Sequence, residues 1–408
     1  MRLLIIIILI ALYGFVHGQK PWQQFPVWDS LKKQIDLHPQ VLADKTQGDV
    51  IRAQQDNLAT LPDPGLGVGI GIQPIETRTG PQQAKLSASQ SFPFFGTLKQ
   101  QAKIYDNRAS AAELLAEDTR ALKIQELKSL LVNLWYQEQK TNLIRKHIDL
   151  LNSGRKVLVS TTSTGQSARV DVIRIENEID AQRKKLSDSR KATSLLRNRI
   201  RILTRYDKPV PEMPDSLKLP VLNVQKADTA AHVKIRALEK HNAAAQEQAR
   251  YARKKGFPTF TLGVDYLITG TYADIDPARE GQDAAMAFVK FNIPLNRKKY
   301  RAMQSEASLK ALQFEQRKEA VADQLTDRWE QISTQMQQWQ DEYALQKRVS
   351  QRTGEALRLT LKNFSTGDVD FETLISLYRQ LINAELAQVN ARARQYIYLA
   401  ESDYLQTR

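Results

Sequence analysis

Residues 84–100 read AKLSASQSFPFFGTLKQ, and this stretch contains the change of pattern that decides the fold. From Leu86 to Phe92, larger and smaller side chains alternate, which is the period-2 pattern of a half-exposed β-strand. Pro93 ends the alternation because proline lacks a backbone N–H and restricts φ. After Gly96 the apolar spacing becomes helical over a long run. The sequence therefore predicts a strand that leads directly into a very long helix.

Three short motifs recur in the same order, about 200 residues apart, and this period is too long for a solenoid. The pairs are Leu66–Val68 with Leu262–Val264, Phe92–Phe94 with Ile293–Leu295, and Ser163–Gly165 with Ser365–Gly367. We interpret the chain as two copies of one unit, at 19–203 and 223–408. Prolines 209, 211, 214 and 220 make the connector between them, 204–222, neither helix nor strand.

Each copy is predicted to contain a first helix, two strands and a long helical hairpin. The expected ranges are a helix at 27–59, strands within 65–92 and a hairpin at 96–203 in the first copy, and a helix at 224–255, strands within 258–293 and a hairpin at 296–406 in the second. The long helices carry narrow apolar stripes, such as Leu127, Leu130, Leu131 and Leu134, which are typical of coiled coils. From Thr97 to Thr161, a continuous helix would be on the order of 100 Å long.

Residues 1–18 have the features of a secretory signal peptide. Arg2 precedes the apolar run Leu3–Val16, and a small residue comes before the expected cleavage site at Gln19. The alternatives are a membrane anchor and a buried N-terminal helix. The exported chain would contain no cysteine. The absence of cysteine excludes disulfides, thiolate metal sites and cysteine nucleophiles. It also excludes the cysteine-linked lipid anchor that some exported bacterial proteins carry.

The formal net charge of +14 raises the question of nucleic-acid binding. Most basic residues are scattered among Gln, Glu and Asp in helical stretches, as on a solvated helix surface. We therefore expect no nucleic-acid partner. Two basic clusters are local, Arg253–Lys255 and Arg297–Lys299, and they flank the second pair of strands.

The strands separate their side chains by polarity. In the first strand the apolar residues Leu66, Val68, Ile70 and Ile72 alternate with glycines. This pattern fits a tilted strand in a bilayer or a half-buried strand of a soluble sheet, and the strands alone leave both open. Four strands cannot close a barrel, and lipid does not tolerate open sheet edges. In a membrane, three copies would supply about twelve strands to a shared barrel, with both basic clusters at one rim.

With these motifs the chain resembles the TolC-type outer-membrane efflux proteins, and most of all their heavy-metal and cation efflux branch. The resemblance covers nearly the whole mature chain. It rests on Leu61–Pro64, Phe92–Gly96, Ile293–Leu295, and the tip patterns Thr164–Gly165 with Val170–Ile173 and Thr366–Gly367 with Phe371–Leu374.

The resemblance implies a mainly α fold with a transmembrane β-barrel portion. Long antiparallel hairpins form a helical tube in the periplasm, and a homotrimer assembles a twelve-stranded barrel in the lipid of the outer membrane. The implied function is a passive exit duct without cofactor, metal or catalytic residues. It would carry small molecules or metal cations from a periplasmic adaptor and an inner-membrane transporter of the resistance-nodulation-division type.

The resemblance also implies roles for particular residues. Candidate gate acids at the periplasmic tip are Asp171, Asp368, Asp370 and Glu372; alternatively, they are helix-start residues favoured by the helix dipole. The resemblance places a second acid at the position that Ile375 occupies in this chain. A gate made of two rings of acids is therefore in doubt. The tip turns at Thr164, Gly165, Thr366 and Gly367 are candidate adaptor contacts, and Pro93, Gly96 and Pro294 are candidate barrel-to-helix junctions.

Three other functions compete with the small-molecule duct. A periplasmic adaptor also carries a helical hairpin, but this chain has two hairpins and too few strands for the adaptor's other domains. A secreted coiled-coil protein would not explain the strands. The outer-membrane duct of a type I secretion system, which exports polypeptides, has the same plan. Catalysis has no support, since His38, His147, His232 and His241 show no metal-binding spacing.

Overall fold

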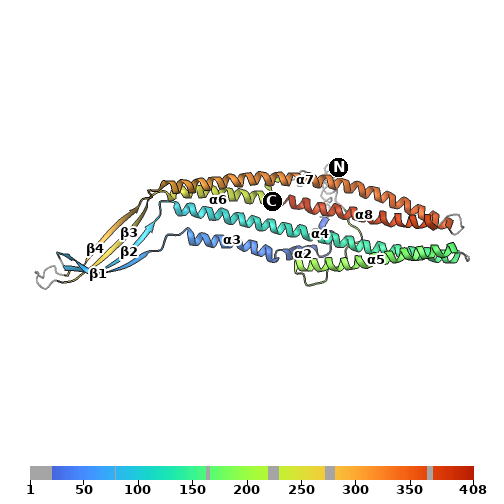
Figure 1. The fold of residues 1–408 in the computed structure, drawn as a ribbon, viewed down its shortest axis with the longest axis horizontal. Coiled ribbons are helices and arrows are strands. Elements are labelled where there is room, and N and C mark those ends of the chain that lie inside the picture. Colours follow the sequence, from blue (N-terminus) through green and yellow to red (C-terminus); the bar gives the residue numbers. More distant parts are fainter. Residues whose placement is uncertain (1–20, 79, 162–165, 219–228, 272–280, 365–370) are drawn as a thin grey trace, which may run out of the picture. The chain divides into compact units, whose positions relative to one another are not determined.

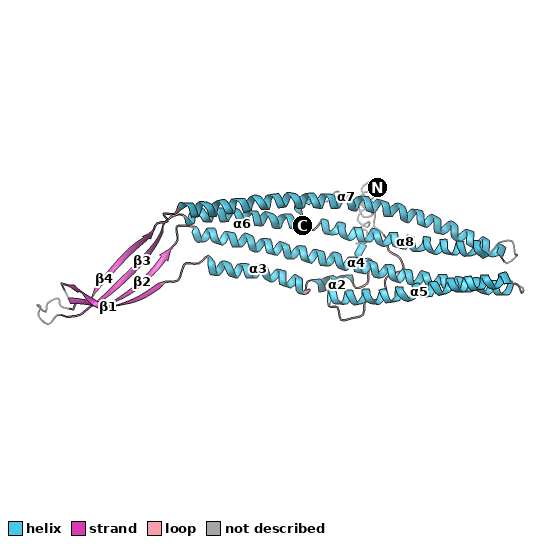
Figure 2. Ribbon diagram, viewed as in Figure 1, coloured by secondary structure: helices cyan, strands magenta, loops and turns pink. Residues whose placement is uncertain are grey.

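A computed structural model describes residues 21–78, 80–161, 166–218, 229–271, 281–364 and 371–408. The expected signal peptide lies outside the described residues. The prediction of a mainly helical chain with a few antiparallel strands is confirmed (Figure 2). The elements are η1 (Pro21–Gln24), α2 (Trp28–Ile35), α3 (Pro39–Leu58), β1 (Gly65–Thr77), β2 (Gly80–Phe92), α4 (Thr97–Thr161), α5 (Gln166–Thr204), η2 (Thr229–Ala231), α6 (Val233–Lys255), β3 (Thr259–Thr269), β4 (Ala284–Asn292), α7 (Arg297–Phe364) and α8 (Phe371–Leu405).

The strands form one antiparallel sheet in the order β1-β2-β3-β4. Its register places Ser87 of β2 opposite Gly67 of β1 and Asp265 of β3. Asp265 in turn pairs with Met286 of β4. The register between β1 and β2 shifts between Ile70 and Ile75. Strands β1 and β4 are therefore the two edges of the sheet within one chain.

The long helices begin directly after the strands. Helix α4 has 65 residues and runs without a break from Thr97 to Thr161, as the sequence predicted. Helix α7 has 68 residues. The prediction of one helix over 27–59 is wrong, because the chain forms α2 and α3 with a turn at 36–38 between them. Pro39 explains the break, since the residue before a proline avoids helical φ and ψ, while proline fits the first position of the next helix.

The chain packs into two compact units, and each draws on both halves of the sequence. Unit 1 comprises Met1–Leu42, Ala116–His232 and Ala322–Arg408, and unit 2 comprises Ala43–Leu115 and Val233–Val321. Helices α4 and α7 contribute residues to both units. Unit 2 contains the whole sheet and the helix ends that join it.

The main core of unit 1 is built around the N-terminal segment. Trp22 and Phe25 stack with ring centroids 5.8 Å apart, and Trp22 meets the ring of Tyr396 edge-on at the same distance. The indole N–H of Trp22 donates to the Asp403 carboxylate at 2.6 Å, and that carboxylate also pairs with the buried Lys128. These contacts tie the start of the described chain to helices α4 and α8.

We expect Leu31→Ala to lower the free energy of local unfolding of α2 by about 2–5 kcal/mol, because Leu31 is fully buried in this core. Leu37→Ala is the matched control, since 55% of Leu37 is exposed just after the same helix and surface changes stay within about 0.5 kcal/mol. Hydrogen exchange of the α2 amides measures both. Equal losses in the two variants would contradict this packing.

Candidate functional site

The candidate tip site lies in unit 1, where α5 and α8 begin. Of the predicted tip residues, Thr164, Gly165, Thr366, Gly367, Asp368 and Asp370 lie outside the described residues. Asp171 lies on α5 and Glu372 in the first turn of α8. A helix dipole favours an acid at the position of Glu372, whereas Asp171 comes after the first turn of its helix. Ile375 is buried in an apolar core, so it presents no second acidic position to solvent.

Arg174 brings the two described acids together. Its Nη1 lies 3.6 Å from Oδ1 of Asp171 and 3.5 Å from Oε2 of Glu372. Arg174 and Glu372 are largely exposed, with side-chain exposures of 53% and 60%. Exposed pairs at such distances contribute little to stability, typically 0–1 kcal/mol. The two ion pairs of Arg174 therefore fit contacts that form and break better than they fit a permanent link between α5 and α8.

A stronger contact joins the same two helices further from the tip. Arg379 of α8 donates from Nε to Oε2 of Glu178 on α5 at 2.9 Å, and the Gln182 amide donates to Oε1 of the same carboxylate at 2.8 Å. Burial by itself would raise the pKa of Glu178, but these two hydrogen bonds outweigh it and hold the pKa below its usual value. Nearby, burial raises the pKa of the Tyr378 phenol to about 12.

Sequence reasoning missed Arg174, Glu178 and Arg379. One signal was available for Arg174, since it follows Asp171 by three residues and i,i+3 positions share a helix face. The partnership of Arg379 with Glu178 joins residues 201 positions apart. No local pattern could have identified that pair, because it depends on how α5 and α8 pack.

The two faces of the sheet in unit 2 differ in the side chains they carry. On one face Leu66, Val68, Ile70 and Ile72 are 74–99% exposed. On the other face Asp265 is buried, and its carboxylate lies 2.6 Å from Nζ of Lys85. Glycines and serines of β1 and β2 line the same face as this ion pair, for example Gly67 opposite Ser87. The sheet thus exposes large apolar residues on one face and holds a buried carboxylate on the other, the reverse of a sheet in a soluble protein.

The predicted junction residues lie between the strands and the helices of unit 2. Pro93 follows the last residue of β2, and Gly96 precedes the first residue of α4. Gly96 has φ of +75°, a left-handed conformation that favours glycine. Its carbonyl accepts hydrogen bonds from the backbone N–H of Gln100 and from Nζ of Lys254 at the end of α6. Pro294 lies between β4 and α7.

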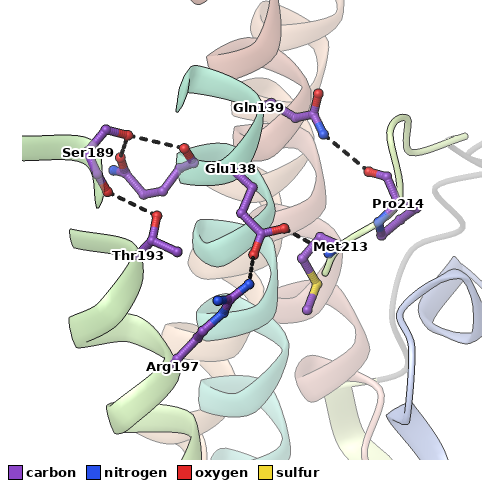
Figure 3. Close-up of polar contacts among 8 residues, drawn as sticks. Glu138, Gln139, Ser189, Thr193, Arg197, Met213 and Pro214 are labelled. Carbon is purple, nitrogen blue, oxygen red and sulfur yellow. Dashed lines mark hydrogen bonds and ion pairs between the residues drawn. The ribbon is translucent and has the colours of Figure 1, made fainter. Parts of the chain in front are cut away.

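A polar cavity of about 480 Å³ lies in unit 1 between α4, α5 and the connector. Figure 3 shows how Glu138 of α4 fastens the connector: its carboxylate accepts from Arg197 and from the backbone N–H of Met213, both at 2.7 Å. The side chain of Gln139 donates to the carbonyl of Pro214. Six charged residues, three of each sign, line the cavity: Arg145, Arg190, Arg197, Glu138, Glu212 and Asp215. The balanced charge and the bonds to the connector fit a structural role.

Among the described residues, no group of three or more His, Asp or Glu side chains could hold a metal ion. A second survey of the same residues finds no helix with the length and apolar character needed to cross a membrane.

Comparison with solved structures finds the same fold in bacterial channel proteins. CusC, whose structures concern folding and transmembrane channel formation, has a TM-score of 0.78 and 16% identity, covering 97% of this chain and 96% of CusC. The outer membrane protein VceC from Vibrio cholerae has a TM-score of 0.74 and 16% identity, covering 95% and 98%. The open-state MtrE outer membrane channel from Neisseria gonorrhoeae has a TM-score of 0.73 and 17% identity, covering 92% and 89%.

No protein-family model and no curated protein matches the sequence. At these identities the comparisons show the fold, and they confirm a mainly helical chain with a few antiparallel strands, as the resemblance in the sequence implied.

We expect the hydrogen bond between Glu178 and Arg379 to make the packing of α8 on α5 sensitive to acid. A carboxyl whose folded pKa lies below its usual 4.5 stabilises the fold above that value, and the contribution is lost as pH falls through the folded pKa. Glu178→Gln should therefore open α8 more easily at neutral pH, by about 1 kcal/mol, and the difference from wild type should close in acid. Hydrogen exchange of the α8 amides at several pH values measures it.

Glu176→Gln on the same helix is the control, since its pair with Arg155 is exposed on both sides. A pH-independent difference for Glu178→Gln, or an equal effect of Glu176→Gln, would contradict the assignment.

Proposed function

We propose that this chain is one subunit of a trimeric, passive exit duct in the outer membrane of a bacterial cell. The observation that carries the proposal is the reversed polarity of the sheet, with Leu66, Val68 and Ile70 exposed on one face and the Asp265 carboxylate buried on the other. Lipid is the solvent in which such an apolar face is stable. The small and polar face would then line a water-filled lumen.

The open edges of the sheet support the trimer. The outward N–H and C=O groups of β1 and β4 need partners in lipid, because an unsatisfied backbone group there costs several kcal/mol. Three copies joined edge to edge would close a barrel of about twelve strands, within the range known for outer-membrane barrels. The helices that continue from the strands would form the periplasmic tube.

We assign the chain a transport role and no catalytic one. In this proposal the tip meets a periplasmic adaptor through the turns around Gly165 and Gly367, and an inner-membrane transporter of the resistance-nodulation-division type drives the flow. The cargo would be small molecules or metal cations. The fold shared with the channels CusC and MtrE supports the duct, whereas the efflux role, partners and cargo rest on the resemblance in the sequence.

The tip contacts support a gate. In a trimer, Asp171, Arg174 and Glu372 would each occur three times around the narrow end. While Arg174 pairs with both acids, it offsets their charge. Two carboxylates and one guanidinium per subunit would leave the ring with a net negative charge, which favours cations.

The first test is the native mass of the mature protein, extracted from separated outer membranes in mild detergent and followed by planar-bilayer recording. A trimer that conducts ions supports the duct. A monomer or dimer in the periplasmic fraction would overturn the proposal and favour the adaptor.

We expect Arg174→Gln to raise the ratio of cation to anion permeability by roughly two- to five-fold at low salt, because it removes the charge that offsets Asp171 and Glu372. Glu372→Gln should lower the ratio. Planar-bilayer reversal potentials in a salt gradient measure both. Arg183→Gln is the control, since Arg183 is an exposed residue of the same helix and pairs with Asp180. The gate assignment fails if Arg174→Gln and Arg183→Gln behave alike.

A further inference from the structure

The two basic clusters of unit 2 have no role in the proposed conduction path. Arg253–Lys255 end α6, and Arg297–Lys299 begin α7. Five of these six side chains are exposed, and Lys254 is half-buried. Within the described part of the chain, none of the six lies within ion-pair distance of a carboxylate. Six cations therefore gather with no acidic partner of their own.

The clusters lie together at the helix ends next to the sheet (Figure 1). Gly256, which follows the first cluster, lies against Tyr300, which follows the second: a Cβ added at Gly256 would be 3.4 Å from the Tyr300 side chain. Lys254 reaches the carbonyl of Gly96 at the start of α4. Helix α4 adds Lys99 and Lys103, both exposed.

The excess of positive charge is confined to this end of the strands. Residues 92–105, 251–257 and 295–305 together hold nine basic residues and no acidic one, so no neighbour on these segments can neutralise the clusters. The nearest acid before the first cluster, Glu247, pairs with Arg250. At the other ends of the strands the described residues carry both signs, with Glu76, Arg78 and Asp283. The sheet is thus strongly asymmetric in charge from end to end.

The helix dipole favours the cations that end α6 but opposes those that begin α7. The start of a helix carries partial positive charge and favours acids. Helix α7 instead begins with Arg297, Lys298 and Lys299 and has no acid in its first turn. Mutual repulsion and the dipole both oppose these cations, and a layer of external anions would offset both effects.

An aromatic and apolar layer lies directly beside the cations. Phe94 and Phe257 stack with centroids 4.5 Å apart, and Phe92 stacks on Phe260 at 5.2 Å. Phe95 and Leu295 are 76% and 89% exposed. Aromatic side chains are enriched at the boundary between hydrocarbon and headgroups, so in the proposed duct the cations next to this layer would be at the height of lipid phosphates.

We propose that Arg253–Lys255 and Arg297–Lys299 form a docking surface for the phosphate groups of anionic phospholipids. The surface fixes the level at which the protein leaves the membrane. This inference rests on the proposed outer-membrane duct and adds a specific lipid partner to it. Charge complementarity favours binding of anionic over zwitterionic lipid. Each clustered Lys or Arg contributes about 1 kcal/mol of binding free energy near an anionic membrane surface.

The test compares R297Q/K298Q/K299Q with the control K347Q/R348Q/R352Q. The control removes three exposed cations from the same helix within unit 1. Native mass spectrometry of the full protein in neutral detergent, titrated with phosphatidylglycerol or phosphatidylcholine, gives the apparent lipid affinities. We expect the first variant to bind phosphatidylglycerol on the order of 100-fold more weakly than wild type, from three cations at the contribution above. The control should bind as wild type does.

A folding defect is distinguishable from loss of binding. Removing cations from the start of α7 relieves the opposition of the dipole, so the thermal midpoint in neutral detergent should stay or rise. Wild-type affinity in R297Q/K298Q/K299Q, an equal loss in the control, or equal binding of phosphatidylcholine would overturn the inference. So would competition by inorganic phosphate at the same concentration as lipid, which would show a general anion site.

Planar-bilayer recording of the wild-type protein separates this inference from the proposed function. Conduction in phosphatidylcholine together with no preference for phosphatidylglycerol would overturn only the lipid surface. No conduction in either lipid would overturn the duct, and the lipid surface with it.

Discussion

Backbone hydrogen bonding at the edges of the four-stranded sheet constrains the rest of the molecule. Strands β1 and β4 each have one side without a partner strand in the chain, and every buried N–H and C=O needs a partner. The apolar face makes the constraint stricter, because Ile70 and Ile72 are exposed where water would penalise them. In the proposed duct, a solvent of hydrocarbon and a neighbouring copy at each edge would satisfy both demands at once.

The passage from sheet to helix changes how the backbone is paired. After Phe92 the chain stops pairing with neighbouring strands, and from Thr97 the backbone forms its hydrogen bonds within α4. Pro93 ends β2, and Gly96 takes the left-handed conformation that turns the chain into α4. Phenylalanines and cations collect around the turn. One short segment thereby combines a change of backbone pairing, a change of direction and a change of surface chemistry.

Much of the fold could be predicted from the sequence because its signals are local and periodic. Alternation over Leu86–Phe92 and the helical run after Gly96 gave β2 and the full extent of α4. The break at Pro39 was a local signal that the prediction overlooked. The candidate site was less accessible: Asp171 and Glu372 were identified through a resemblance, while their common partner Arg174 was missed. The two-copy organisation remains a prediction.

The sequence by itself determined the order and type of the elements, the two faces of the sheet and the position of the basic clusters, since each depends on neighbouring residues and on the period of strand or helix. Only the tertiary structure decided which residues from distant segments meet. The division into two units that each draw on both halves of the chain, the Trp22–Tyr396 core and the bond from Arg379 to Glu178 all depend on helix packing. Packing follows from shape and burial summed over many side chains, and no short stretch of sequence records it.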